Sequence, residues 1–366
     1  MNNASQQPIV IMAGGTGGHV FPALAVAEYL RSRGESIVWL GTRAGIESRL
    51  VPAANISIEW LSVQGLRGKG AATLLLAPFR LLRACWQAYR TLSRLRPKAV
   101  LGMGGFVSGP GGLMAWLLRT PLILHEQNSV IGLTNKLLSR FASRSFFAFP
   151  EAARGVARSE CIGNPVRDEM FALEASETRL TKRLEDTMNI LVIGGSLGAA
   201  SLNKVLPAAV SGIDENARPN IKHQCGNKHL QSCQKNYQDA GVEAEVLDFI
   251  DDMSAAYAWA DLVVCRAGAL TISELTAVGV GSVLIPYPYA VDNHQFHNAR
   301  FLEENRAARI LDESELSAES LVALLIEFQN NRQALIDLAK NAQALAKPHA
   351  TENLAQGILS ISGAKS

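Results

Sequence analysis

The chain has 366 residues, of which 48% are hydrophobic and 19% charged, and this composition excludes a disordered, collagen-like or coiled-coil protein. A chain of this length is expected to fold as two domains, each with its own core. The net charge of +2 is unevenly distributed. Residues 1–150 contain 16 Lys and Arg and 5 Asp and Glu, a net charge of +11, whereas residues 151–366 contain 19 Lys and Arg and 28 Asp and Glu, a net charge of −9. We therefore expect the first part to face a phosphate-bearing substrate or an anionic membrane.

The five cysteines form no CxxC pair and have no nearby histidine at metal-ligand spacing, which is typical of reduced thiols in a cytosolic protein. The first residues lack the charged and apolar regions of a signal peptide. No apolar run approaches the ~18 residues that cross a bilayer. We therefore expect a protein that is soluble or lies on a membrane without spanning it, and we predict no metal, no cofactor and no nucleic-acid partner.

Short runs of Val, Ile and Leu alternate with segments of helical length along the chain. Runs that are apolar on both faces are typical of buried strands in parallel sheets, joined by crossover helices. The predicted strands are Ile9–Met12, Ile37–Leu40, Ala99–Leu101, Leu122–Leu124, Ile190–Ile193, Glu245–Phe249, Leu262–Cys265 and Val283–Ile285. This pattern predicts an α/β protein.

One part of the pattern occurs twice. The first strand and its glycine-rich turn, IVIMAGGTGG at 9–18, are repeated as ILVIGGSLG at 190–198, with the paired glycines, the hydroxyl residue and the last glycine each offset by 180 positions. Two Rossmann-like domains explain this repeat and the length together. We place the domains at 1–166 and 167–346, with a final helix within 347–366 that packs back on the first domain.

Three glycine-rich loops, at 14–18, 102–112 and 194–198, follow predicted strands. Glycine at such a turn lets backbone N–H groups approach a phosphate, and the start of the next helix favours negative charge. None of the loops has the GxGxxG spacing of dinucleotide-binding proteins or the P-loop pattern, which disfavours both classes. We expect the loops to contact a phosphate or a sugar. The alternative is that these glycines only form tight turns.

The segment GGSLG at 194–198 also matches the G-x-S-x-G turn that presents a nucleophilic serine in α/β-hydrolases, here Ser196. Acidic residues and then His294 and His297 follow in the chain order of that catalytic triad. A serine hydrolase is therefore an alternative, but it gives no role to the first half of the chain with its matching loop.

The segment CRAGALTISEL at 265–275 indicates a strand, a turn of small residues and a helix that we expect to begin near Thr271. The backbone N–H groups of Ala269, Leu270 and Thr271 would then face an anion. Glu274 follows at once, where a carboxylate can accept hydrogen bonds from ribose hydroxyls. The alternative is a capping box from Thr271 to Glu274 that only stabilises the helix.

The apolar residues Leu75, Phe79, Leu82 and Trp86 recur at helical spacing beside a row of arginines. This pattern is typical of a helix that lies at a membrane surface, with its apolar side in lipid and its cations among anionic headgroups. The alternative is a crossover helix that buries the same stripe on its own sheet, particularly over residues 85–95.

Taken together, these motifs resemble a known family, the MurG glycosyltransferases of peptidoglycan synthesis. The matching stretches are AGGTGGHVFPALA (13–25), GLRGKG (65–70), GMGGFVSGPGG (102–112), LHEQN (124–128), GLTNK (132–136), GNPVR (163–167), GGSLGA (194–199), FIDDM (249–253), CRAGALTISEL (265–275) and IPYPYAVDNHQFHNA (285–299). They follow one another over nearly the whole chain. The resemblance implies a GT-B-type fold, in which two Rossmann-like domains with parallel sheets face a cleft.

The resemblance also implies a reaction, the inverting transfer of N-acetylglucosamine from UDP-N-acetylglucosamine to the C4 hydroxyl of the muramyl sugar of lipid I. The product would be lipid II. Because lipid I is undecaprenyl-pyrophosphoryl-muramyl-pentapeptide, the enzyme would act as a peripheral protein on the anionic cytoplasmic face of the inner membrane. A glycosyltransferase with another UDP-sugar or lipid acceptor is the alternative.

Individual roles follow from the same resemblance, which places the donor mainly on the second domain. The implied substrate-binding residues are Thr16, Gly17, Gly18 and Asn128 in the first domain and Arg167, Ser196, Ile250, Ala269, Leu270, Thr271, Ile272, Ser273, Glu274 and Gln295 in the second. His19 is the candidate general base, because histidine titrates near pH ~6.5, and Glu126 is the second candidate. Helix starts and arginine can neutralise the departing diphosphate without a metal ion.

Overall fold

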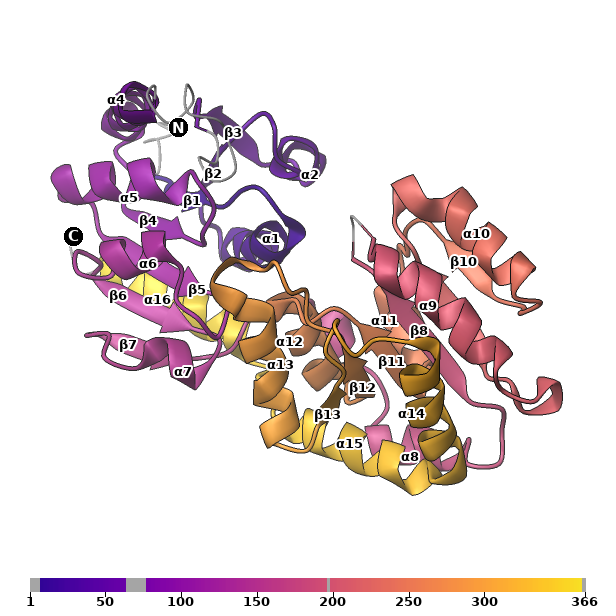
Figure 1. Cartoon of the computed structure of the whole chain (residues 1–366). Helices are drawn as coiled ribbons and strands as arrows, with labels where there is room; N and C mark the ends of the chain where they lie inside the picture. The colour runs from indigo at the N-terminus through magenta and orange to yellow at the C-terminus, as the bar shows by residue number, and fades with distance from the viewer. Residues whose placement is uncertain (1–6, 64–76, 196–197, 364–366) are drawn as a thin grey trace. The chain divides into compact units, whose positions relative to one another are not determined.

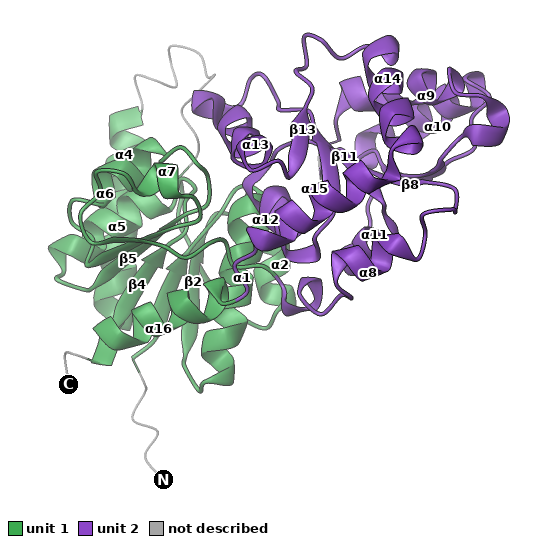
Figure 2. Ribbon diagram, turned by 90° about the horizontal axis from the view of Figure 1, so that it is seen from below, with its two compact units in different colours: residues 1–166, 349–366 green, residues 167–348 purple. Residues whose placement is uncertain are grey.

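The computed structural model describes residues 7–63, 77–195 and 198–363. The chain forms two compact units, residues 1–166 with 349–366 and residues 167–348 (Figure 2). Each unit is built around its own parallel β-sheet with helices packed on it (Figure 1). The predicted class, two parallel-sheet α/β domains, is confirmed.

Across the described residues, the sheet of the first unit has seven parallel strands in the order β3-β2-β1-β4-β5-β6-β7. Their bounds are β1 (Ile9–Met12), β2 (Ile37–Gly41), β3 (Ser57–Trp60), β4 (Ala99–Gly102), β5 (Leu122–Glu126), β6 (Arg144–Phe147) and β7 (Ser159–Cys161). Side chains alternate between the two faces of a strand. Accordingly Ile9 and Ile11 belong to one buried cluster, and Val10 and Met12 belong to another. Helices therefore cover both faces of this sheet.

The helices of the first unit are α1 (Gly17–Ser32), α2 (Glu47–Ala53), α4 (Ala77–Leu95), α5 (Ser108–Leu117), α6 (Leu133–Leu138), α7 (Pro150–Ala153) and α16 (Ala350–Gly363). The last of these comes from the C-terminal end of the chain and packs on α1. Leu354 and Ile358 are fully buried in the same cluster as Ile9, and the Tyr29 hydroxyl donates a 3.3 Å hydrogen bond to Glu352. The C-terminal helix is thus part of the core of the first unit.

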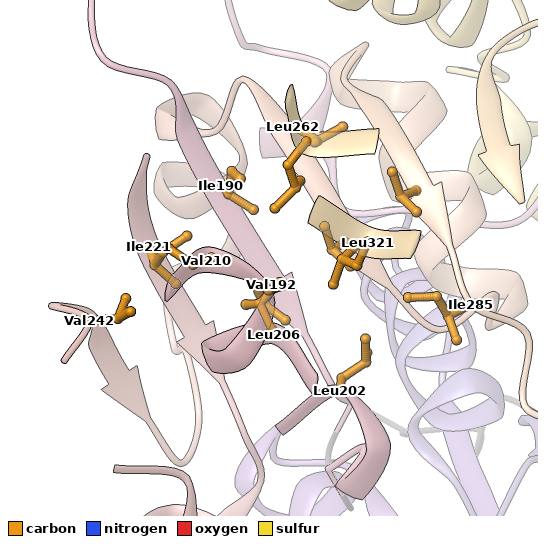
Figure 3. Packing of buried hydrophobic residues seen from close by; sticks show 14 of the residues in the cluster. Ile190, Val192, Leu202, Leu206, Val210, Ile221, Val242, Leu262, Ile285 and Leu321 are labelled. Atoms are coloured by element: carbon orange, nitrogen blue, oxygen red, sulfur yellow. The ribbon is translucent and has the colours of Figure 1, made fainter. Parts of the chain in front are cut away.

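The described part of the second unit contains a six-stranded parallel sheet in the order β10-β9-β8-β11-β12-β13. Its strands are β8 (Asn189–Ile193), β9 (Asn220–Gln224), β10 (Glu245–Leu247), β11 (Leu262–Cys265), β12 (Gly281–Leu284) and β13 (Ala308–Ile310). Ile190 and Val192 of the central strand pack with Leu202 and Leu206 in the core of this unit (Figure 3).

The α-helices of the second unit are α8 (Ser176–Thr181), α9 (Ala200–Ser211), α10 (Leu230–Asp239), α11 (Met253–Trp259), α12 (Ala269–Val278), α13 (His294–Glu304), α14 (Ala318–Asn330) and α15 (Arg332–Ala344). Its 3₁₀ turns are η1 (Asp168–Met170), η2 (Glu215–Ala217), η3 (Asn227–His229) and η4 (Val291–Asn293).

Both sheets reverse their strand order at one point, between β1 and β4 in the first unit and between β8 and β11 in the second. At such a point the connections leave the two neighbouring strands in opposite directions, so a crevice opens beyond their carboxyl ends, where α/β proteins bind ligands. The glycine loop after β1 and the loop after β4 flank this point in the first unit. The loops after β8 and β11 flank it in the second.

All eight strands expected from the sequence are present, with ends within two residues of the prediction. The prediction did not include β3, β6, β7, β9 and β13. Three of these, β3, β7 and β13, are edge strands. A strand at or near an edge is partly exposed to solvent and keeps polar residues such as Glu59, Lys222 and Arg309. Its apolar run is therefore too short to be recognised.

Candidate functional site

The first glycine-rich loop connects β1 to α1. Gly15 has a φ of +96°, a left-handed conformation that favours glycine. Its N–H donates a 3.0 Å hydrogen bond to Oε2 of Glu47, which begins α2 and is fully buried. Thr16 is the N-cap residue of α1, and its Oγ1 lies 3.3 Å from Nδ1 of His19. The loop thus sets the orientation of the imidazole that we predict to be the base.

The loop after β4 packs against the first loop and against His19. Gly104 and Gly105 have left-handed backbones, with φ of +92° and +80°. A Cβ atom on Gly104 would lie 2.5 Å from Cδ2 of His19, and one on Gly105 would collide with the carbonyl oxygen of Gly14. The buried hydroxyl of Ser108 donates a 2.8 Å hydrogen bond to the carbonyl oxygen of Gly104. Glycine at these two positions lets the loops meet at the imidazole.

Glu126 ends β5, is 4% exposed and holds the loop that follows it. Oε1 accepts hydrogen bonds from the backbone N–H of Asn128 at 3.1 Å and from its side-chain amide at 3.3 Å. Oε2 accepts from the N–H of Gly132 at 3.0 Å and from the amide of Asn135 at 2.8 Å. Both carboxylate oxygens are occupied by donors from the loop after β5 and from the first turn of α6. This arrangement suits a residue that positions Asn128 better than it suits a general base.

Two neighbours of Glu126, His125 and Gln127, were missed by the sequence analysis. His125 is fully buried, and burial lowers its pKa to about 4, so the ring is neutral at physiological pH. Its Nε2 donates to the carbonyl oxygen of Gly163 at 2.9 Å, and its Nδ1 accepts from the Gln127 amide at 3.2 Å. That amide also donates to the carbonyl oxygen of Met103 at 2.9 Å. The sequence signal that could have identified His125 is the position of a histidine inside the apolar run LILHE.

In the second unit, α12 begins at Ala269, two residues before the predicted start. Gly268 is its N-cap residue and has no side chain with which to cap the helix, while Thr271 already lies within the first turn. The capping box that begins at Thr271 is therefore wrong. The buried Asn298 holds the preceding turn by donating from its amide to the carbonyl oxygen of Ala267 at 3.1 Å. The helix start faces the carboxyl edge of the sheet, which favours an anion there.

Glu274 lies one turn further along α12, and its side chain is 12% exposed. The hydroxyl of the buried Tyr257 donates a 3.1 Å hydrogen bond to its Oε2, and Nη2 of Arg167 lies 4.0 Å from its Oε1. Burial raises the pKa of Glu274 to about 7, with Arg167 and the Tyr257 hydroxyl acting in the opposite direction. The structure thus brings together two of the predicted residues. Tyr257, on α11, was not predicted, because a tyrosine in a helix gives no spacing signal.

The loop after β12 leads to Gln295 on the first turn of α13. Its Oε1 accepts a 3.0 Å hydrogen bond from the backbone N–H of Tyr287. The guanidinium of Arg266 lies 5.5 Å from the centre of the Tyr287 ring and donates to Oγ of Ser201 at 2.9 Å. Arg266 belongs to the loop after β11, so it fastens that loop to the loop after β12 and to α9.

The other predicted binding residues of this unit offer mainly backbone atoms. The side chains of Ile250 and Ile272 are 7% and 1% exposed, and the Ser273 hydroxyl donates to the carbonyl oxygen of Ala269 at 3.0 Å. Ser196 lies outside the described residues, as does the hydrolase motif that depends on it.

The helix α4 turns its apolar stripe outward. Phe79, Leu82 and Trp86 are 71%, 67% and 59% exposed, whereas Ala84 and Ala88 are fully buried. The helix therefore packs on the sheet through these alanines and the buried Leu92, as a crossover helix, and leaves the three large side chains in solvent. The alternative in which the stripe itself is buried is wrong for these three residues.

Further large apolar side chains are exposed on α5, on α6 and directly after α6. Trp116 and Phe141, both more than 40% exposed, have ring centroids 4.6 Å apart. Leu117 and Leu137 are also more than half exposed. We refer to Phe79, Leu82, Trp86, Trp116, Leu117, Leu137 and Phe141 as the apolar surface of the first unit. The predicted membrane residue Leu75 lies outside the described residues. In the ranges that the structure describes, none of the helices has the length and apolarity to span a bilayer.

Two family models match the chain, the glycosyltransferase family 28 N-terminal domain over residues 9–147 and the glycosyltransferase family 28 C-terminal domain over residues 189–354. A curated relative from Nitrosomonas europaea is 51% identical over 97% of this chain and 99% of its own length. Another from Marinobacter nauticus is 47% identical over 97% of each chain. Both are named UDP-N-acetylglucosamine–N-acetylmuramyl-(pentapeptide) pyrophosphoryl-undecaprenol N-acetylglucosamine transferase.

Solved structures are similar over nearly the whole chain. MurG of Acinetobacter baumannii has a TM-score of 0.84 at 40% identity, with 97% of this chain and 99% of that chain covered. The calicheamicin glycosyltransferase CalG4 has a TM-score of 0.69 at 14% identity, with 98% and 99% covered, which is a similarity of fold alone.

Proposed function

The chain belongs to glycosyltransferase family 28, among the MurG enzymes, and we propose that it transfers N-acetylglucosamine from UDP-N-acetylglucosamine to the muramyl sugar of lipid I. The product is lipid II, so the reaction is a step of peptidoglycan synthesis. The observation that carries this proposal is the similarity to relatives of that name, because it covers 97% of the chain and so includes both units. Membership in this family also favours glycosyl transfer over a serine hydrolase.

The second unit supplies the donor site in this proposal. Glu274, held by Tyr257, accepts hydrogen bonds from the ribose hydroxyls, and the start of α12 with Arg167 stabilises the diphosphate. The remaining contacts are assigned to the backbone of Ile250 for uracil, to Gln295 for the sugar, and to Ala269, Leu270, Thr271, Ile272 and Ser273 along the start of the helix.

The first unit supplies the chemistry. When Nδ1–H of His19 donates to Oγ1 of Thr16, Nε2 carries the lone pair and accepts the proton of the acceptor C4 hydroxyl. The C4 oxygen then forms a bond to the anomeric carbon as the bond to UDP breaks, which inverts the configuration. The electron pair leaves on the diphosphate, where Arg167 and the helix start stabilise it. Glu126 acts by holding Asn128.

The first unit also supplies the membrane contact. Its apolar surface lies beside the exposed Arg80, Arg83 and Arg90 of α4, and residues 1–150 carry a charge of +11. An apolar face flanked by cations is suited to an anionic lipid surface. Because the acceptor is linked to a polyprenyl chain in the membrane, we propose that this surface docks on the cytoplasmic face of the inner membrane.

Transfer to a short-chain lipid I analogue tests the proposal, with UDP-N-acetylglucosamine, UDP-glucose and UDP-galactose as competing donors. We expect a product heavier by one N-acetylhexosamine and a preference for UDP-N-acetylglucosamine of about 10-fold or more, because a site that binds the acetamido group is left with unpaired polar atoms by the other sugars. Equal use of the three donors would support the alternative of another UDP-sugar transferase. Release of UDP without transfer would contradict the proposed reaction.

A further inference from the structure

Glu47 is a fully buried carboxylate to which the proposed chemistry gives no role. Burying a charge is costly unless hydrogen bonds satisfy it. The N–H and the hydroxyl of Thr42 donate to its Oε1 at 3.0 and 2.7 Å, and the N–H of Gly15 donates to its Oε2 at 3.0 Å. Three donors thus bind one side chain, and one of them belongs to the glycine loop that precedes His19.

The surrounding backbone is shaped to receive this carboxylate. A Cβ atom on Gly14 would lie 2.6 Å from Oε1, and one on Gly45 would collide with Oε2. Glycine at these two positions leaves the space that the carboxylate occupies. Glu47 also lies in the first turn of α2, where the helix dipole favours negative charge. The side chain is therefore held in one place by contacts from two loops.

The position of His19 depends on the segment that Glu47 holds. Gly15 directly precedes Thr16, whose Oγ1 lies 3.3 Å from Nδ1 of the imidazole. On the other side, Gly104 packs against the imidazole ring. Trp39 anchors the end of β1 separately, because its indole N–H donates to the carbonyl oxygen of Ala13 at 2.8 Å. The hydrogen bond from Gly15 to Glu47 therefore governs the loop rather than the strand.

We propose that Glu47 is a positioning residue for glycosyl transfer: by accepting the Gly15 N–H it holds the loop in the conformation that places Thr16 and His19 for proton abstraction. This inference rests on the proposed function. A displacement of the base by about 1 Å is enough to cost ~100-fold in rate, so a residue that acts only through loop geometry can have a large effect on kcat.

The test is Glu47→Gln, which keeps the size of the side chain but turns one acceptor into a donor facing N–H groups. We expect kcat to fall by ~10- to 100-fold, while KM for UDP-N-acetylglucosamine stays within about 2-fold, because the donor is held mainly by the second unit. Glu35→Gln is the matched control. The side chain of Glu35 is 12% exposed and forms an ion pair with Lys98. Because Glu35 precedes β2, it lies at the amino ends of the strands, away from the carboxyl ends where His19 lies, so its substitution should leave kcat unchanged.

A double variant with His19→Ala separates positioning from a general loss of structure. If Glu47 acts through His19, Glu47→Gln lowers kcat no further in the His19→Ala background. An undiminished additional loss there, a wild-type kcat for Glu47→Gln, or an equal loss for Glu35→Gln would each overturn the inference. If Glu47→Gln does not fold, Thr42→Val removes one donor to the same carboxylate. It should lower kcat a few-fold at constant KM, and an unchanged kcat would overturn the inference.

The wild-type chain distinguishes a failure of this inference from a failure of the proposed function. Absence of transfer by the wild type would contradict the proposed reaction itself. Normal transfer by the wild type together with normal transfer by Glu47→Gln would contradict only the role of Glu47.

Discussion

At the scale of single residues, the candidate site contains buried polar groups. Burying such a group can lower the free energy of unfolding, but it also fixes the group where a substrate can bind. Glu274 is the clearest example, because burial raises its pKa to about 7 from an ordinary 4.5, although Arg167 and the Tyr257 hydroxyl act to lower it. A group with a raised pKa in the folded chain contributes stability below pH 4.5, and this contribution is lost as the pH rises through 7. Above pH 7 the free protein therefore carries a buried charge at the position that we propose for the ribose hydroxyls.

We predict that Glu274→Gln stabilises the free protein at pH 8 and weakens donor binding. Glutamine still accepts from Tyr257 but carries no buried charge, so the free energy of unfolding should rise by up to about 3 kcal/mol at pH 8 and by little at pH 5. Thermal unfolding at the two pH values measures the difference, with the half-exposed Glu327→Gln as control. Equal destabilisation of Glu274→Gln at both pH values would contradict this account.

Residue roles were predictable from the sequence only where a motif carried them. The resemblance assigned Arg167 and Glu274, which the structure places 4.0 Å apart. The prediction did not include Tyr257, Gln127 and Asn298. Each of these polar side chains contacts a distant segment of the chain, and such a contact produces no spacing pattern in the sequence around the residue. Such contacts are set by how the strands and helices pack, so they follow from the fold and not from the local sequence.

At the scale of elements, α4 is a crossover helix that also exposes an apolar stripe, two features that its sequence pattern left as alternatives. Its buried face consists of Ala84, Ala88 and Leu92, whereas Phe79, Leu82 and Trp86 are exposed. The position of the apolar stripe was predictable from helical spacing. The face that packs on the sheet was not predictable, because two of its three buried residues are alanines, whose apolar signal is weak beside that of the exposed aromatic residues.

We predict that Phe79→Glu combined with Leu82→Glu abolishes binding to anionic vesicles. The two carboxylates would lie in the lipid-facing stripe and also oppose the anionic headgroups. Cosedimentation with vesicles of mixed anionic and zwitterionic lipid measures the loss. Ile326→Glu, at a 39% exposed position of α14 in the second unit, is the matched control and should bind normally. Equal binding of the double variant and the control would refute the membrane assignment.

At the scale of the whole molecule, the repeat at 9–18 and 190–198 corresponds to two sheets that reverse their strand order at equivalent points. Length and repeat were enough to predict this architecture. The charges of +11 and −9 over residues 1–150 and 151–366 fit the division that we propose, with the acceptor and the membrane on the first unit and the donor on the second. A nucleotide held by a helix start and a few side chains needs little net positive charge.

The most direct test of this division compares His19→Ala with Glu274→Gln in two measurements, the Kd for UDP-N-acetylglucosamine by calorimetry and kcat at saturating donor. We predict that His19→Ala lowers kcat by ~100-fold or more and changes Kd by less than about 3-fold, because a general base acts on the reaction and not on donor binding. Glu274→Gln should do the reverse, raising Kd by about 10-fold or more with a smaller change in kcat. Loss of donor affinity in His19→Ala with kcat retained at saturation would contradict the account.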